Sequence, residues 1–442
     1  MMPLSLYAVT LSWALDGWII VIGILASVAC ALLGNFLVLR RMSMLGDAMT
    51  HAVLPGIAIA FILSQSRSSP LMFLGAVIVG ALTAFFTEWL RGVGKVDEGA
   101  SMGVVFTTLF AIGLVMMVQA ADRIDLDPNC VLYGAMEPAA LDRISIGGFR
   151  VPRSIVVLSI VAGVNLVFVI LCFKELCLTS FDPSLATTMG FSANRMHYFL
   201  MILVSVTAVA CFESVGSILV VAMFIVPGAT AYLLTDRLSW MIGLSILLGA
   251  SSALFGHLSA VFVPSWFGYS STTTASMIAV VGGCFFGAAA TLSPSHGIVT
   301  KWTRRQLLSF QILCDDVVAS LFRGEESGRD HANHTGLGKS LLAGPVAIRF
   351  SVWWLRRTGD IEDGALIKLT DQGRERGKQL VRSHRLWEQY LVDQAGLETD
   401  RIHGSAERFE HFTDRAMREQ LSEQTDAPNN DPHGKPIPEE FN

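Results

Sequence analysis

The sequence predicts an all-α, polytopic membrane protein with about eight or nine transmembrane helices, followed by a small, mainly α-helical polar domain. Three observations predict this class. Of the 442 residues, 52% are hydrophobic and only 16% are charged. Up to Ser293, apolar runs of roughly 20 residues recur, which is the length that an α-helix needs to cross a bilayer. After Thr300 the chain becomes polar and rich in charge.

The apolar part divides into nine candidate spans. We expect them near residues 17–39, 46–64, 71–90, 100–120, 154–173, 197–212, 215–234, 240–263 and 275–292. The apolar segment from Tyr198 to Leu234 is too long for one crossing, and the sequence Glu213-Ser-Val-Gly216 in its middle predicts a break between two helices. Because lipid cannot satisfy free backbone groups, this break should be buried against protein or line a cavity.

Composition and missing motifs narrow the classes of function. The seven cysteines have no paired metal-ligand spacing, and the net charge of −5 gives no reason to expect nucleic-acid binding by the whole chain. The chain has no G-x-x-x-x-G-K-[ST] phosphate loop, so any ATP hydrolysis needs a separate subunit. It also has no HExxH or comparable cluster, which argues against an intramembrane metalloenzyme.

Asp47 and His51 are two ionisable residues at the start of an apolar helix, in "RRMSMLGDAMTHAVLPGIAIAF". Their spacing places both side chains on one helical face. An ionisable side chain inside a membrane costs at least about 2.5–3.5 kcal/mol and requires a partner, water or a ligand. Carboxylate and imidazole together suit Mn²⁺, Fe²⁺ or Zn²⁺. We predict that the pair lines a metal pathway; the alternative is that both lie at the membrane interface, with Asp47 near the helix start.

Pro55 and Gly56 follow the pair after one turn. A proline inside a helix removes a backbone donor and clashes with the preceding turn. We therefore expect a loosened helix here, with exposed carbonyl groups.

The segment "KELCLTSFDPSLATTMGFSANR" lies between two spans, at residues 174–195. Pro183 marks the first turn of a short helix, and Gly190 marks its end. The segment is too short for a domain and too amphipathic for a simple loop. We predict a surface helix that serves as a docking element; the alternative is an ordinary helical connection.

These segments, together with "VGSILVVAMFIVPGATAYLL", resemble the permease subunit of the ATP-binding-cassette importers of manganese, zinc and iron. The resemblance covers roughly residues 15–295 and implies a permease domain over residues 1–300. It implies a second permease copy, as a homo- or heterodimer, around a central pathway. It also implies an ABC ATPase subunit docked from the cytoplasm, an extracytoplasmic metal-binding protein, and a location in the cytoplasmic membrane of a bacterium.

The resemblance also assigns roles to residues. The positions of Asp47 and His51 line the metal pathway in that family, and the helix matching residues 181–192 is gripped by the ATPase. The coupling residues are then Phe181, Asp182, Leu185, Ala186 and Gly190.

The number of crossings after this helix has a consequence for Glu213. If residues 174–195 and the C-terminal domain both face the cytoplasm, the spans between them are even in number, so residues 198–234 must cross twice. Glu213 is then a further candidate pathway residue; the alternative is a helix-end carboxylate exposed to headgroups. His257, a single histidine near a membrane edge, is expected to be satisfied locally.

The C-terminal part begins with the basic sequence "KWTRRQ", which predicts that it stays in the cytoplasm. We place a domain at 301–425 and a disordered tail at 426–442, since the tail is rich in Pro, Asn and acidic residues.

Two helical patterns in this domain carry ligand-type side chains, separated by Gly396. His384 and Glu388 are four residues apart on the first pattern. If the helices pack antiparallel, these side chains converge with those of the second pattern on facing edges: His403, Glu407, Glu410 and His411. The alternative is a pair of charged, solvated faces with incidental histidines.

This segment resembles the metal-sensing, winged-helix repressors of the diphtheria-toxin-repressor and manganese-transport-regulator family. The patterns "LT..G......V..H.L.E..L" and "H...E..EH" are reproduced, and residues 305–425 are covered. The resemblance implies metal binding by the same six residues. Glu407 stands where iron sensors have Cys and manganese sensors have Glu, which favours manganese. Asp316 matches an acidic ligand of the family, whereas Ala319 stands at its second acidic position.

The DNA-reading part of the family is poorly reproduced. Residues 358–370 are a plausible wing with "DIEDG" as its turn, but residues 336–350 contain few side chains suited to base edges. We expect a degenerate winged helix kept for regulation or dimer contact. The sequence therefore predicts a metal-importer permease, with manganese before zinc or iron; the alternative is a membrane-anchored, metal-responsive transcriptional regulator.

Overall fold

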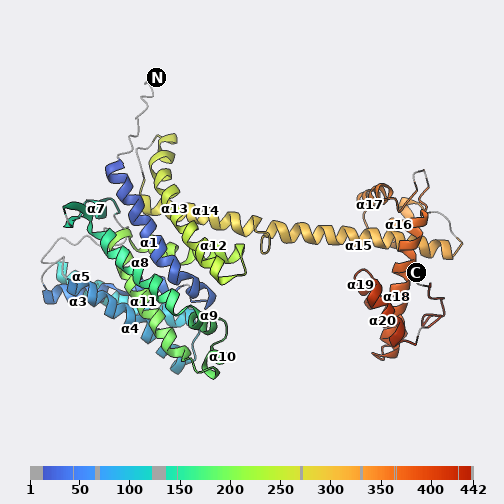
Figure 1. The fold of residues 1–442 in the computed structure, drawn as a ribbon, viewed down its shortest axis with the longest axis horizontal. Coiled ribbons are helices and arrows are strands. Elements are labelled where there is room, and N and C mark those ends of the chain that lie inside the picture. Colours follow the sequence, from blue (N-terminus) through green and yellow to red (C-terminus); the bar gives the residue numbers. More distant parts are fainter. Residues whose placement is uncertain are drawn as a thin grey trace, which may run out of the picture. The chain divides into compact units, whose positions relative to one another are not determined.

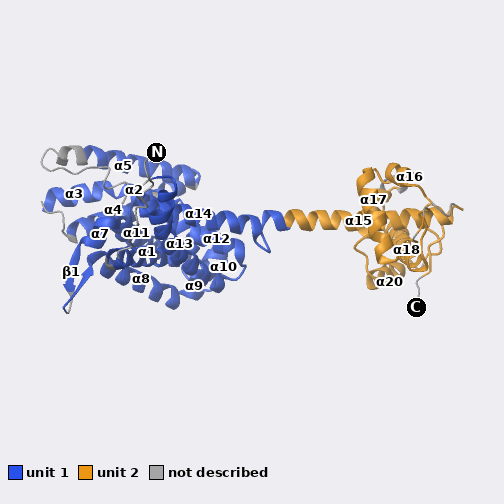
Figure 2. Cartoon of the chain, turned by 90° about the horizontal axis from the view of Figure 1, so that it is seen from above, with its two compact units in different colours: residues 1–300 blue, residues 301–442 orange. Residues whose placement is uncertain are grey.

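The computed structural model describes residues 13–42, 44–64, 70–121, 136–146, 148–268, 272–328, 332–362, 364, 366–426 and 428–439. These residues are mainly α-helical, which confirms the predicted fold class. The chain forms two compact units, Met1–Thr300 and Lys301–Asn442, which Figure 2 shows in different colours.

The membrane unit contains helices and one small hairpin. The helices are α1 (Trp13–Leu39), α2 (Leu45–Ala52), α3 (Leu54–Ser64), α4 (Pro70–Gly94), α5 (Glu98–Ala121), α7 (Met136–Leu141), α8 (Arg153–Leu171), α9 (Phe173–Phe181), α10 (Pro183–Thr188), α11 (Ala193–Val215), α12 (Ser217–Leu234), α13 (Leu238–Trp266) and α14 (Thr274–Leu292). Strands β1 (Arg143–Ile146) and β2 (Phe149–Pro152) pair antiparallel. Within the described residues, eight helices are long and apolar enough to cross a membrane: α1, α4, α5, α8, α11, α12, α13 and α14.

The expected span at 46–64 is instead two short helices, α2 and α3, which meet at Val53. Pro55 is the physical reason, since its ring would clash with the carbonyl of His51 in a continuous helix. Glycines let α3 pack closely against its neighbours. A Cβ added at Gly56 would lie 2.3 Å from the carbonyl oxygen of Gly75 on α4, and one at Gly113 on α5 would lie 2.6 Å from Pro55.

The segment 198–234 is broken at Gly216, as the sequence predicts. Gly216 has φ +83°, a conformation that favours glycine, and it separates α11 from α12. The flanking Val215 and Ser217 are buried, so protein encloses the break.

Helix α1 is central to the membrane unit. It packs against α8, α12 and α13, as Figure 1 shows. The contact with α12 is backbone-close, because a Cβ added at Gly34 would lie 2.1 Å from the carbonyl oxygen of Phe224. Since lipid supplies no hydrophobic drive between helices, such close packing at small residues holds membrane helices together.

The second unit is built on the end of α15 (Ile298–Glu326), which begins before the unit boundary. It continues with α16 (His334–Ser340), α17 (Pro345–Thr358), α18 (Asp371–Asp393), α19 (Thr399–Glu410) and α20 (Arg415–Gln424). Apolar residues of α15, α16 and α17 form its core with Ile361, Ile367 and Leu369. Between α17 and α18, Ile361 and Leu369 form an antiparallel bridge, which gives the predicted wing.

Residues 428–439 make specific contacts, which differ from the disorder expected for this segment. The Asp431 carboxylate accepts hydrogen bonds from the backbone N–H groups of His433 and Lys435. Ile437 is buried against Leu386 and Leu421. From the polar composition we did not expect that Ile437 would be buried, or that the Asp431 side chain would hydrogen-bond the backbone of its own turn.

Replacing Gly34 by Ala is expected to destabilise the membrane unit by roughly 1–3 kcal/mol or more, because the new methyl group must displace the Phe224 backbone. Thermal unfolding in detergent measures this as a lower melting temperature. Gly163→Ala on α8 is the matched control, since a Cβ there meets nothing within 4 Å. Equal melting temperatures for the two variants would contradict the packing argument.

Candidate metal sites

Helix α2 carries Asp47 and His51 in the membrane unit. His51 is partly buried, and its ring centroid lies 6.2 Å from that of Phe106 and 5.9 Å from that of Phe110, both on α5. Asp47 belongs to the same helix, but its side chain lies outside the described part of the structure. A Cβ added at Gly46 would lie 3.2 Å from the ring of Phe224. Helix α2 is therefore enclosed between α5 and α12.

Glu213 lies at the end of α11, three residues before Gly216, and its side chain is exposed. This position fits a helix-end carboxylate. Buried polar side chains elsewhere in the membrane unit serve as links between helices. The amide nitrogen of Asn35 donates to Ser245 Oγ at 2.7 Å, and that of Asn165 donates to Thr207 Oγ1 at 2.8 Å.

Asp16 is a polar residue of the membrane unit that the sequence analysis missed. Its Oδ1 lies 3.3 Å from Nε2 of the buried His257, whose Nδ1 lies 3.2 Å from Thr274 Oγ1. The three residues link α1, α13 and α14. The Nδ1 atom of His257 has a local hydrogen-bond partner, as expected, whereas its buried Nε2 only approaches Asp16 without forming a hydrogen bond. Asp16 directly precedes the first expected span, and only its early position in an apolar segment could have drawn attention to it.

Helices α9 and α10 form the predicted surface element between α8 and α11. Asp182 caps α10 by accepting hydrogen bonds from the N–H groups of Ser184 and Leu185 at 3.0 and 2.9 Å. A hydrogen bond from the Ser184 hydroxyl, together with these backbone bonds, lowers the pKa of Asp182. Gly190, with φ +88°, follows the end of the helix.

The surface of this element is apolar. Phe181, Leu185 and Met189 are exposed, whereas Ala186 is fully buried. The element is fixed to α1, because the guanidinium of Arg40 donates to Thr179 Oγ1 at 2.8 Å and to Ser180 Oγ at 3.1 Å. It thus presents large apolar side chains from a backbone that is anchored on the membrane unit.

In the second unit, α18 and α19 bring His384, Glu388 and His403 together. His384 Nε2 lies 3.1 Å from Glu388 Oε1 and 2.9 Å from His403 Nδ1. His384 and Glu388 are buried. Burial raises the pKa of Glu388, but hydrogen bonds and charges from the two histidines outweigh it and lower this pKa to about 2. Two imidazoles and an ionised carboxylate are ligands suited to a divalent transition metal.

A second cluster joins Asp316 of α15 with Glu410 and His411. His411 Nε2 lies 3.3 Å from Asp316 Oδ1 and 3.8 Å from Glu410 Oε1, and its Nδ1 lies 3.5 Å from Asp315 Oδ2. Burial lowers the pKa of His411, but Asp315, Asp316 and Glu410 more than offset this and raise it to about 10. The metal-free imidazole is therefore protonated at neutral pH.

The two clusters are linked through Glu410, whose Oε2 lies 2.5 Å from His384 Nδ1. Each cluster offers three ligand atoms within 4.8 Å of one another. Five of the six residues expected to bind metal are therefore in the clusters: His384, Glu388, His403, Glu410 and His411.

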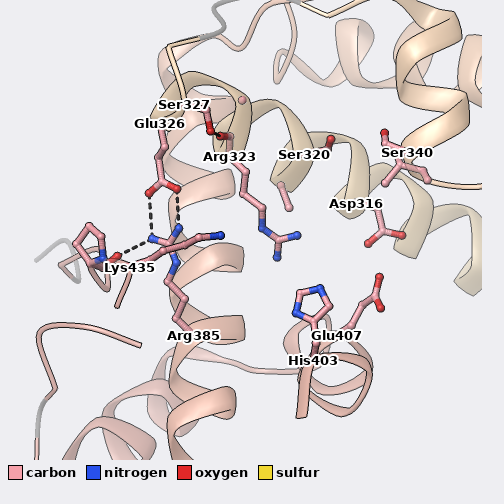
Figure 3. A pocket seen from close by; sticks show the side chains of 14 residues that line it. Asp316, Ser320, Arg323, Glu326, Ser327, Ser340, Arg385, His403, Glu407 and Lys435 are labelled. Atoms are coloured by element: carbon pink, nitrogen blue, oxygen red, sulfur yellow. Dashed lines mark hydrogen bonds and ion pairs between the residues drawn. The ribbon is translucent and has the colours of Figure 1, made fainter. Parts of the chain in front are cut away.

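Glu407 is in neither cluster. It is exposed on the wall of a cavity of about 730 Å³, into which Asp316 also points (Figure 3). Ala319 lines this cavity, so the position of the second acidic ligand contributes only a methyl group. Arg323 enters from α15, with Nη2 3.6 Å from Glu410 Oε2. Arg323 lies one helical turn after Ala319 on α15, and the sequence analysis did not identify it.

Comparisons with known proteins agree with this division of the chain. Residues 15–291 match the ABC 3 transport family, and residues 370–439 match the family described as iron dependent repressor, metal binding and dimerisation domain. The second match covers α18, α19 and α20 and the packed segment after them.

Individual proteins resemble the membrane unit. The chain is 41% identical over 290 residues to the manganese transport system membrane protein MntD of Bacillus subtilis, covering 65% of this chain and 96% of the relative. It is 39% identical over 283 residues to the zinc transport system membrane protein TroD of Treponema pallidum, covering 64% and 75%.

Among solved structures, PsaBC from Streptococcus pneumoniae in complex with Fab has a TM-score of 0.53 and 29% identity, covering 66% of this chain and 94% of that chain. The match over residues 15–291 spans more than half of the chain and overlaps each of the eight candidate membrane spans found among the described residues. The chain is therefore a multi-pass membrane protein of the ABC 3 transport family.

Proposed function

We propose that this protein is the permease subunit of an ATP-binding-cassette importer for divalent transition-metal ions, with manganese as the first candidate and zinc or iron next. The observation that carries this proposal is the family match across all eight candidate spans. The names of the relatives support manganese and zinc. The proposed partners are a separate ABC ATPase subunit, an extracytoplasmic metal-binding protein and a second permease copy, in the bacterial cytoplasmic membrane.

Asp47 and His51 are the proposed pathway ligands. The support is their four-residue spacing along α2 and the enclosed position of His51 beside α5. Helix α2 ends directly after the pair and Pro55 has no backbone N–H to donate, so backbone carbonyl groups near the pair are not all committed to a helix. Glu213 is a weaker candidate, because its side chain is exposed.

Helices α9 and α10 are the proposed coupling element, with Phe181, Asp182, Leu185, Ala186 and Gly190. The exposed apolar side chains would contact the ATPase, Asp182 and Gly190 would shape the short helix, and buried Ala186 would hold it on the membrane unit. Under this proposal α9 and α10 face the cytoplasm. The four candidate spans that follow them, α11 to α14, would return the chain to the same side, so the second unit would be cytoplasmic as well.

The second unit is proposed to sense metal in the cytoplasm and to restrain transport when metal is plentiful. Support comes from the two ligand clusters and from the match at residues 370–439. A ligand shifts an equilibrium by its differential affinity for the two states, so feedback requires only that metal favours one arrangement of this unit. Carboxylate and imidazole ligands suit manganese, although Arg323 adds a competing positive charge.

His51→Ala is expected to reduce metal uptake at least roughly tenfold, because the ion loses an imidazole ligand in a desolvated pathway. Uptake of radioactive manganese into cells that express the complete transporter measures this, with membrane abundance determined in parallel. His296→Ala is the matched control, since that histidine is partly exposed and paired with Asp236. Unchanged uptake in His51→Ala and Asp47→Ala would refute the pathway.

Leu185→Asp is expected to weaken ATPase binding, because it places a charge on an exposed apolar surface without disturbing the core. Co-purification of the ATPase and its stimulated hydrolysis rate measure the effect. The matched control is Leu141→Asp on α7, another exposed leucine of the membrane unit. Equal losses in both variants, or none in either, would count against the coupling role.

Mn²⁺ binding to the full-length protein is expected to release at least about one proton at pH 7, because a metal ligand must be deprotonated and the pKa of His411 is raised to about 10. Affinity should therefore rise with pH up to that value. Calorimetry in buffers of different ionisation enthalpy measures the released protons.

The same measurement has a matched pair of variants. Glu410→Ala/His411→Ala should remove this proton-linked heat, whereas Glu419→Ala/His334→Ala, at exposed positions outside the clusters, should retain it. A heat that is identical in every buffer, or unchanged by the first pair, would exclude the site.

A further inference from the structure

Helix α17 has an unusual outer face. Its inner residues, Ile348, Val352 and Leu355, are buried in the core of the second unit. On the opposite side, four large apolar side chains are exposed: Val346, Phe350, Trp353 and Trp354. Spacings of three and four residues place them on one side of the helix, and we call this surface the aromatic face. About half of the surface of Phe350 and Trp353 remains open, at 51% and 49%.

The aromatic face is a continuous packed surface. The rings of Phe350 and Trp353 are stacked, with their centroids 5.5 Å apart. The ring centroid of Phe310 on α15 lies 5.0 Å from that of Phe350 and 6.4 Å from that of Trp354. Figures 1 and 2 both show α17 and α20 on opposite sides of α15. Exposed apolar patches of this kind mark interaction sites.

The charged residues of helix α17 have one sign. Helix α17 contains Arg349, Arg356 and Arg357 and no carboxylate. Arg357 lies over the ring of Trp353, with its Cζ 5.8 Å from the ring centroid. Tryptophan and arginine together suit the boundary of a membrane, where rings enter the acyl region and guanidinium groups pair with lipid phosphates.

Other occupants fit less well. DNA would neutralise the three arginines of α17, but it would offer no apolar layer to the exposed rings of Phe350, Trp353 and Trp354. In a symmetric contact with a second copy, the same patch would face itself, so three arginines would oppose three arginines without carboxylates to neutralise them. An anionic lipid surface supplies both the apolar layer and the opposite charge.

The chain itself supplies proximity to a membrane. Helix α14 is a candidate membrane span that ends at Leu292, and α15 begins at Ile298 and carries Phe310. Residues 301–305 near the start of α15, Lys-Trp-Thr-Arg-Arg, repeat the combination of tryptophan and basic residues. A tethered module needs only weak intrinsic affinity, because tethering raises its effective concentration. We propose that the aromatic face of α17 docks into the headgroup region of an anionic phospholipid membrane.

The test uses the full-length protein in nanodiscs, with the photoreactive residue benzoylphenylalanine in place of Phe350. The matched control carries it in place of Phe412, an exposed phenylalanine of the same unit outside the aromatic face. In discs that contain phosphatidylglycerol, lipid adducts detected by mass spectrometry should be roughly tenfold more abundant at position 350 than at position 412. In discs of phosphatidylcholine alone, the yield at position 350 should fall toward that of the control.

A second variant tests the charge. Arg349→Gln/Arg357→Gln, combined with the probe at position 350, should reduce lipid adducts several-fold in anionic discs, because both side chains are exposed and carry no core contacts. Equal adduct yields at positions 350 and 412 would overturn the proposal. So would adducts to a second copy of the chain in place of lipid, or a yield that is independent of lipid charge.

Discussion

The close contact between Gly34 and the carbonyl oxygen of Phe224 is the constraint on which the membrane unit depends. No side chain fits between α1 and α12 at this point. The ring of Phe224 also lies against Gly46 at the start of α2. One residue of α12 thus sets the position of the central helix and of the short helix that holds His51. The candidate pathway is therefore fixed by packing between backbones, which suits a membrane interior where apolar contacts alone give little drive.

In the second unit, the carboxylate of Glu410 is the group on which the arrangement of both clusters depends. Glu410 lies next to His384 of one cluster and His411 of the other, and the guanidinium of Arg323 lies 3.6 Å from it. A metal ion in either cluster would change the charge that the other experiences. Ala319 removes one acidic group and Arg323 adds a positive charge. Both features reduce the negative potential that attracts a divalent ion, so the proposed sensor responds to abundant rather than trace metal.

In the proposed function, the two units combine transport and metal sensing in one chain. Helix α17, which precedes the wing, exposes Trp353 and Trp354 beside its three arginines. The main function is that of a permease family member rather than of a transcriptional regulator, because the family match covers residues 15–291. The winged-helix arrangement supplies a rigid frame for the ligand clusters and for the aromatic face.

Local patterns in the sequence determined eight of the nine expected spans, the break at Gly216, the capped helix after Asp182 and the ligand spacing on α18 and α19. Each depends on residues within a few turns of one another, so hydrophobic length, glycine and helical periodicity suffice. Only the tertiary structure decided the pairing of Asp16 with His257, the exclusion of Glu407 from both clusters, the approach of Arg323 and the packing of Ile437. These features depend on which distant segments come into contact, and spacing along one helix carries no information about the helix opposite.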